Sequence, residues 1–301
     1  MAGSAEINRE AISAVPIRRR PSTARQIRYY LRKKPLGSFG LAIVVIVGVT
    51  ALFAPLIAPF SFQEQNYDTL KVAPNLTNLF GTDNFGRDIF SRVVYGSRIS
   101  LMVGFLAVLV GTGIGAVVGL ITGYYMGKLD AFVQRIVDMW MSFPDLILAL
   151  TIVAVFGNTM TNVILAIAAT ILPRGVRIIR SSTLVLRETE YVMAARAIGA
   201  SNRRIILRHI TPNTMAPFLI IMSSMFGTAI LTEAGLSFLG LGIAPPTPSW
   251  GGMLTGQAAQ YAMTAPWIII FPGMALSITV LGFAFAGDAL RDILDPKQRD
   301  R

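Results

Sequence analysis

Long stretches of apolar residues that contain no Asp, Glu, Lys or Arg recur along this chain. A helix that crosses a membrane needs about 20 mostly apolar residues, and the stretches predict six such helices. The chain is therefore expected to be an all-α, polytopic membrane protein. The predicted spans cover residues 39–60, 99–127, from near 131 to a turn at 157–159, from that turn to 173, 209–232, and from 266 to about 286.

Helix-breaking residues interrupt two of the apolar stretches. Gly157-Asn158-Thr159 divides one of them into two spans joined by a tight turn. Pro245-Pro246-Thr247-Pro248 cannot form regular helix, so the last stretch predicts a charge-free outer loop, 234–265, before the final span. Within that loop, residues 236–242 are too few to span. They leave open a short helix dipping into the bundle or one lying on its surface.

The composition agrees with a membrane protein. Hydrophobic residues make up 53% of the chain and charged residues only 14%, against about 45–50% and about 25% in soluble domains. This argues against a soluble enzyme and against a disordered chain, because too much apolar surface would lack polar cover. The net charge of +11 suits either nucleic acid or an anionic membrane surface, and the positions of the charges decide between them.

The positive charges lie mostly on one side of the predicted spans. An even number of spans separates two basic clusters, so the positive-inside rule places both clusters and both termini in the cytoplasm. Of 27 Lys and Arg residues, 23 then face the cytoplasm, which makes a nucleic-acid role a weak alternative. The first cluster is Arg9, Arg18, Arg19, Arg20, Arg25, Arg28, Arg32, Lys33 and Lys34, and the second is Arg174, Arg177, Arg180, Arg187, Arg196, Arg203, Arg204 and Arg208.

Two features of the sequence exclude several kinds of site and segment. Cys is absent and His209 is the single His, so neither a thiolate nor a His-cluster metal site is available, and no metal site is predicted. The basic segment 1–38 precedes an apolar stretch longer than the roughly 7–15 residues of a signal peptide, which favours a retained anchor.

Glycines recur every four residues in the second predicted span. Gly111, Gly115, Gly119, Gly123 and Gly127 line one helix face, where another backbone can approach closely. A protein interface or pathway and ordinary packing inside the bundle are both compatible with this pattern, and we favour packing.

The first outer segment, 61–98, contains a group of charged and small residues. Thr82 or Asp83 is expected to cap a helix in which Asp88 and Arg92 pair. An amphipathic helix on the membrane surface and a specific recognition role remain equally open. The candidate residues are Gly81, Thr82, Asp83, Gly86, Arg87, Asp88, Ser91 and Arg92.

A few polar or aromatic residues near the spans are candidates for special roles. Asp138, Asp145 and Glu233 are ionisable groups near or within spans, and such groups are functional candidates by default. Trp250 and Trp267 suit the aromatic belt at the membrane interface.

The cytoplasmic segment between the fourth and fifth spans, 180–212, predicts two short helices that meet at a glycine. Residues 187–198 form the first, Gly199 ends it, Ser201 caps the second and Pro212 ends that. Small Ala194 and Ala195 leave a shallow surface for another protein, with apolar contact from Tyr191, Val192 and Ile198. From the residues alone, a basic helix lying on anionic lipid remains an alternative.

This segment resembles the loop of binding-protein-dependent ABC importer permeases, whose pattern is Glu-Ala-Ala, three residues, Gly, nine residues, then Ile-x-Leu-Pro. Ala194, Ala195, Gly199 and Pro212 fit these spacings, whereas Met193, His209 and Thr211 depart from the pattern. Three further motifs resemble the C-type subunit of the dipeptide/oligopeptide/nickel subfamily. They are Gly81-Thr82-Asp83-x-x-Gly86-Arg87-Asp88-x-x-Ser91-Arg92, Arg196-Ala-x-Gly199-Ala-Ser201 and Arg208-His209-Ile-x-Pro212-Asn213.

The resemblance implies a type I ABC importer permease fold with a transmembrane core over 99–288 and a cytoplasmic tail over 289–301. It implies a homologous B-type permease as partner, two cytosolic ATPase subunits or one fused ATPase, and an extracytoplasmic solute-binding protein. ATP and Mg²⁺ would be bound by the ATPases, because this chain has no Walker pattern. The implied coupling residues are Glu190, Tyr191, Ala194, Ala195, Arg196, Gly199, Ser201, Arg208, His209 and Pro212.

The expected function is therefore that of a non-catalytic permease subunit in the inner membrane, forming half of a pathway for peptides. Nickel, heme or glutathione-type cargo is the alternative. An intramembrane hydrolase is disfavoured because the only His lies at a cytoplasmic boundary. An ion-coupled carrier is disfavoured because no internal repeat is evident.

Overall fold

The computed structural model describes residues 35–255, 260–261 and 263–294. Of the predicted N-terminal segment 1–38 and tail 289–301, residues 1–34 and 295–301 lie outside the described residues. The remaining residues of both belong to helices, which begin at Pro35 and end at Leu294, so both predicted boundaries are wrong. The described chain is built from helices: α2 (Pro35–Leu52), α3 (Ala54–Ile57), η1 (Tyr67–Thr69), α4 (Ile89–Tyr125), α5 (Gly127–Met141), α6 (Asp145–Phe156), α7 (Met160–Arg187), α8 (Glu190–Ala197), α9 (Asn202–Ile205), η2 (Ile206–Ile210), α10 (Thr211–Phe238), α11 (Trp250–Met253) and α13 (Trp267–Leu294).

Five helical stretches are long and apolar enough to cross a membrane, which confirms the all-α membrane fold: α2, α4, α7, the continuous stretch from α9 to α10, and α13. The predicted third span is different. It consists of α5 and α6, which meet at an angle of 89°. Pro144 lies at the break and disfavours helical backbone at Phe143, so an apolar stretch that looks continuous in sequence is bent.

Several predicted boundaries are wrong. The first span ends earlier than predicted for 39–60, since α2 ends at Leu52 and the separate short helix α3 follows. Two other spans are longer, because polar residues extend their helices beyond the apolar parts. The second begins at Ile89 rather than 99, so Arg92 and Arg98 lie within α4. The fourth passes through Pro173 to Arg187, and Arg174, Arg177 and Arg180 therefore lie on α7 rather than in a cytoplasmic loop.

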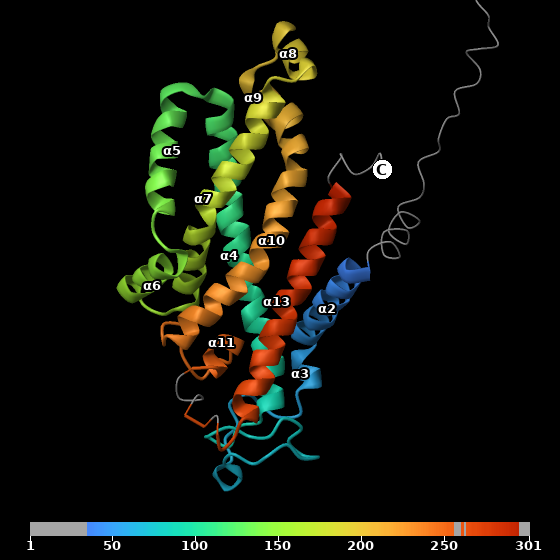
Figure 1. Cartoon of the computed structure of the whole chain (residues 1–301), viewed down its shortest axis with the longest axis vertical. Coiled ribbons are helices and arrows are strands. Elements are labelled where there is room, and N and C mark those ends of the chain that lie inside the picture. Colours follow the sequence, from blue (N-terminus) through green and yellow to red (C-terminus); the bar gives the residue numbers. More distant parts are fainter. Residues whose placement is uncertain (1–34, 256–259, 262, 295–301) are drawn as a thin grey trace, which may run out of the picture.

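The long helices alternate in direction between two ends of the bundle (Figure 1). Helices α8 and α9 lie at one end, and the segment between α3 and α4 lies at the other. Helices α2, α5 and α10 run away from the α8 end, whereas α4, α7 and α13 run toward it. The predicted sidedness makes the α8 end cytoplasmic.

Helices α4 and α7 form the closest seam of the bundle, and they run parallel. A Cβ at Gly111 would lie 2.6 Å from the carbonyl oxygen of Ala168, and one at Gly119 would lie 2.7 Å from that of Val176. Gly115 and Gly123 meet α7 just as closely, at Leu172 and Thr183. The glycine face thus packs inside this chain, and any larger residue would separate the two helices. Gly127 does not belong to the seam, since it has a positive φ and open space around it.

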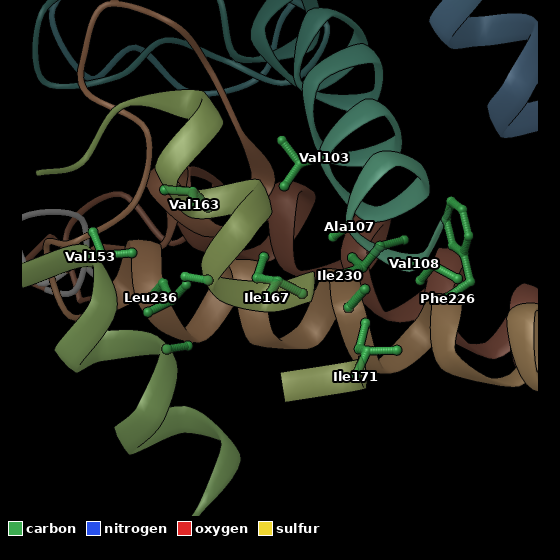
Figure 2. Packing of buried hydrophobic residues seen from close by; sticks show 13 residues of the cluster. Val103, Ala107, Val108, Val153, Val163, Ile167, Ile171, Phe226, Ile230 and Leu236 are labelled. Atoms are coloured by element: carbon green, nitrogen blue, oxygen red, sulfur yellow. The ribbon is translucent and has the colours of Figure 1, made fainter. Parts of the chain in front are cut away.

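The main apolar core lies where α4, α6, α7 and α10 meet (Figure 2). Val103, Val153, Ile167 and Ile230 each come from a different helix and are almost completely buried. This core holds the four helices together in the middle of the bundle, between the two ends that carry the candidate functional residues.

Candidate functional site

A glycine turn ends α8 at the cytoplasmic end. Gly199 has φ of +83°. The amide of Ala200 donates to the carbonyl of Ala195, and the amide of Gly199 donates to that of Arg196, each at 3.0 Å. These two bonds form a Schellman motif, which needs a left-handed residue at the glycine position. Helix α8 starts at Glu190 rather than 187, because α7 continues to Arg187.

The chain after the turn does not form a separate short helix. The Ser201 hydroxyl accepts a bond from the Arg204 amide and caps α9, but the helical stretch then continues through Pro212 into α10. A π-helical turn, η2, precedes the proline. Its wider winding accommodates a residue without an N–H, and the prediction that Pro212 ends the helix is therefore wrong.

The two faces of α8 have different environments. Val192 is fully buried and Ala195 is 7% exposed, so both pack against this chain rather than forming a surface for another protein, contrary to the prediction. The exposed positions of α8 and its C-cap instead include Ala194 and three larger apolar side chains. Those are Tyr191, Met193 and Ile198, which are 43%, 47% and 86% exposed. Of the other predicted coupling residues, Glu190, Arg196, Ser201, Arg208 and Pro212 are exposed and His209 is half-buried.

The predicted coupling segment, residues 180–212, is fixed to the end of α4. The Tyr124 hydroxyl donates to the side-chain oxygen of Asn202 at 2.8 Å, and the Arg187 guanidinium donates to the Tyr124 carbonyl at 2.7 Å. Tyr124 also packs in an apolar cluster with Val192, Ile205 and Ile210. Tyr124 was not singled out from the sequence, and Arg187 was named only as a member of the basic cluster. No local spacing connects Tyr124 to this segment, because its contacts with Asn202 and Arg187 span 78 and 63 residues.

At the opposite end, Asp83 organises the charged motif. Its Oδ1 accepts bonds from the amides of Phe85 and Arg87 at 2.8 and 3.0 Å, and its Oδ2 accepts from Arg87 Nε at 2.7 Å. Arg92 Nε lies 3.8 Å from the same oxygen, and another Arg92 nitrogen donates to the Phe62 carbonyl. Asp83 is 6% exposed, so its carboxylate is compensated by donors of the motif and is not available to solvent.

Asp88, rather than Thr82 or Asp83, caps α4. Its Oδ2 accepts from the Ser91 amide at 2.7 Å and its Oδ1 accepts from Asn78 Nδ2 at 3.0 Å. The predicted Asp88–Arg92 pair is therefore wrong, because the turn directs Arg92 toward Asp83 instead. The motif is thus neither an amphipathic surface helix nor an open charged patch.

The remaining motif residues hold the outer segment in place. Thr82 Oγ1 accepts from the Val72 amide at 2.9 Å and donates to the Thr69 carbonyl at 2.5 Å. The Ser91 hydroxyl accepts from the Phe60 amide at 3.2 Å. Gly81 and Gly86 have positive φ, and a Cβ on Gly86 would lie 1.8 Å from the Asn66 carbonyl oxygen. The motif therefore holds the residues before α4 against the start of that helix.

A pocket of about 830 Å³ lies beside this motif. Its lining includes Asn84 and Arg87 of the motif and Ser237, Ser249 and Thr255 of the segment 237–255. The pocket thus brings charge-neutral outer-loop residues together with the charged motif.

The outer loop is buried more deeply than expected. Trp250 is 2% exposed, and its indole N–H donates to the Val93 carbonyl at 3.0 Å, so it does not belong to an interfacial belt. Trp267 Nε1 donates to the Thr82 carbonyl at 3.2 Å. Residues 236–238 continue α10, and the buried short helix is α11 instead. Glu233 is fully buried on α10 and accepts a bond from the Ser237 hydroxyl at 2.8 Å, so it does not face water.

The other intramembrane acids pair with arginines of α7. Asp138 pairs with Arg177, and Asp145 pairs with Arg174 at 2.6 Å. A third pair, Asp130–Arg180, was missed in the sequence. The spacing of three residues between these arginines was the available signal, since it places them on neighbouring positions of one helix.

Comparison with known proteins identifies the class to which this architecture belongs. The family described as "Binding-protein-dependent transport system inner membrane component" matches residues 115–300, and "N-terminal TM domain of oligopeptide transport permease C" matches residues 22–76. The protein is thus an ABC importer permease of the inner membrane. The chain belongs to the binding-protein-dependent transport system inner membrane component family, in its C-type peptide-permease branch.

Individual relatives agree with this assignment. The chain is 45% identical over 269 residues to the dipeptide transport system permease protein DppC of Alkalihalophilus pseudofirmus, covering 89% of this chain and 88% of that protein. It is 43% identical to the glutathione transport system permease protein GsiD of Escherichia coli O6:K15:H31, covering 88% of each. The solved MetNI methionine ABC transporter has the same fold, with a TM-score of 0.55 and 21% identity over 68% of this chain and 96% of that one.

Proposed function

We propose that this chain forms one half of a translocation pathway for short peptides, beside a homologous B-type permease. An extracytoplasmic solute-binding protein delivers the peptide, and two cytosolic ATPase subunits or one fused ATPase supply the energy. ATP and Mg²⁺ are bound by those ATPases, and this subunit performs no chemistry. The dipeptide and glutathione permeases among its relatives support a peptide cargo.

The outward face of α8 is the observation that carries this proposal. Ile198, the C-cap residue of α8, is 86% exposed at the end of the bundle, and Tyr191 and Met193 of the same helix are 43% and 47% exposed. An apolar group exposed to this degree beyond the spans gains free energy when another protein covers it, at roughly 25 cal/mol per Å² of apolar surface. Because Val192 and Ala195 anchor α8 from behind, a subunit that seats on this face can move the helix and the segment attached to it.

Substitution of Ile198 tests the docking surface directly. In the complete complex purified in detergent, Ile198→Glu is expected to reduce co-purification of the ATPase at least about tenfold, as loss of roughly 1.4 kcal/mol of binding free energy would. Leu76→Glu provides the matched control, since Leu76 is 99% exposed in the segment between α3 and α4, at the opposite end of the bundle. It should retain the ATPase. Equal retention in both variants would exclude α8 as the docking surface.

The cargo is tested on the binding protein that works with this permease. Titration calorimetry with dipeptides, longer peptides, glutathione, nickel and heme is expected to show tightest binding for a peptide. If glutathione binds more tightly than every peptide, the cargo is glutathione-type, as the name of the GsiD relative suggests. Preference for nickel or heme over both would refute the peptide assignment.

A further inference from the structure

Helix α5 has little apolar packing against the rest of this chain. Val137 is its one buried apolar residue, although α5 is 15 residues long. Leu129, Phe132, Ile136 and Met139 point outward and are between 37% and 67% exposed. In Figure 1, α5 stands apart from the central bundle, and α6 continues from it at a steep angle. Apolar burial therefore does not determine where α5 lies relative to α7.

Three ion pairs connect this bent helix pair to α7. Arg180 donates from two nitrogens to the two carboxylate oxygens of Asp130, each at 2.6 Å. Arg177 pairs with Asp138 farther along α5, and Arg174 pairs with Asp145 at the start of α6, at 2.6 Å. The contacts thus follow the whole length of α5 and pass the bend at Pro144. Because α5 and α7 run in opposite directions, the acids Asp130, Asp138 and Asp145, taken in sequence order, pair with arginines of α7 in the reverse order.

Helix α7 has a different connection on its other side. Its backbone lies directly against the glycine face of α4, from Gly111 to Gly123. At its cytoplasmic end, Arg187 contacts the last turn of α4, and Tyr124 of that turn holds Asn202 of the coupling segment. Helices α4 and α7 and the coupling segment are therefore joined by close backbone packing and buried side chains, so they are expected to move as one body.

We infer that the three ion pairs are the linkage through which this body moves α5 during transport, whereas α6 is also held to it by the apolar core through Ala149 and Val153. The six residues are positioning residues, and the inference rests on the proposed ATPase coupling at α8. Paired charges suit this role because Arg–carboxylate bonds are directional. In the most buried pair, the side chains of Arg180 and Asp130 are 28% and 11% exposed, and breaking this contact leaves a poorly solvated carboxylate without its partner. Apolar contact alone would allow α5 to slide along α7.

Spin-label distance measurements in the complete complex test this linkage. The chain has no native Cys, so introduced cysteines are labelled uniquely within it when the partner subunits are also cysteine-free. The labels for the α5–α7 distance replace Phe132 on α5 and Val185 on α7, whose side chains are 67% and 69% exposed in the native protein. Labels at Val117 on α4 and at Val185 report the control distance within the α4–α7 body. Transport per ATP hydrolysed is measured in the same preparations.

The decisive variant is Asp130→Asn/Asp138→Asn/Asp145→Asn. It is expected to broaden the α5–α7 distance distribution, to leave the α4–α7 distribution unchanged, and to reduce transport per ATP at least fivefold while ATP hydrolysis continues. The exchange Asp130→Arg/Arg180→Asp, in an otherwise native chain, should keep the narrow α5–α7 distribution and most of the transport. It also shows whether opposite charge, rather than residue identity, is what matters.

The outcomes separate this inference from the proposed function. If the triple variant keeps a narrow α5–α7 distribution and native transport per ATP, the linkage is refuted while ATPase coupling stands. If the native complex shows no ATP-dependent transport, the proposed function fails, whatever the distances show. Should the triple variant not assemble, the exchange variant decides, because a broad α5–α7 distribution in an assembled exchange variant overturns the inference.

Discussion

The outer motif around Asp83 and the cytoplasmic helix α8 place their side chains in opposite ways. At the outer end, Asp83 and Asp88 are 6% and 4% exposed, and each accepts bonds from several donors of this chain. At the cytoplasmic end, Ile198 is 86% exposed although it is apolar. Polar groups buried with their partners stabilise the chain that contains them, whereas exposed apolar groups gain only when a second molecule covers them. The contrast indicates a stabilising role for the motif and supports the proposed docking role of α8.

The largest effect on stability is expected from Asp83→Ala. The substitution leaves Arg87 and Arg92 without their carboxylate and two backbone amides without their acceptor, so the free energy of unfolding should fall by about 3–5 kcal/mol. Thermal unfolding of the purified complex measures the loss. Asp68→Ala, at an exposed acid of the same outer segment, should change stability by no more than about 0.5 kcal/mol. Similar losses in the two variants would contradict the scaffold role of the motif.

Gly199→Ala is expected to have a smaller effect, at the other end. The left-handed backbone at φ of +83° costs a non-glycine residue about 1–2 kcal/mol, although no atom would crowd the new Cβ. Because the strain falls on the turn behind α8, substrate-stimulated ATPase activity should decrease while the complex still assembles. Gly113→Ala is the control, since Gly113 has open space and lies within α4. A decrease in stimulation as large in the control as in Gly199→Ala would refute this role of the turn.

The smallest of these effects is expected from Asp88→Ala. Loss of the cap on α4 should cost about 1 kcal/mol of unfolding free energy. Asp88→Ser keeps an oxygen that can accept from the Ser91 amide and should lose less. Neither variant should change ATPase co-purification, because the change lies at the outer end. Reduced co-purification in Asp88→Ala would break the division of roles between the two ends.

Features that depend on neighbouring residues were predictable from the sequence. The Gly199 turn and the Ser201 cap are formed by residues within a few positions, and the structure contains both. The all-α fold followed equally well from the long charge-free stretches, because those stretches must be buried in lipid or protein.

Features that depend on distant parts of the chain were not predictable. Asp88 and Arg92 have the spacing of a helical pair, but the turn around Asp83 competes for Arg92. Asp138 and Asp145 were recognisable as unusual, yet their partners, Arg177 and Arg174, lie 39 and 29 residues away. The apolar stretches predicted that these arginines lie in a cytoplasmic loop, whereas they lie on α7. Pro212 looked like a helix end because a π turn cannot be read from composition.

The parallel arrangement of α4 and α7 has an electrostatic consequence at the cytoplasmic end. Each helix carries the equivalent of roughly half a negative charge at its C-terminus, and parallel packing brings two such ends together. The Arg187 guanidinium lies on the Tyr124 carbonyl of α4 and so offsets part of this backbone charge. The electric field that an approaching subunit meets there is therefore set by main-chain dipoles as well as by the basic side chains around them.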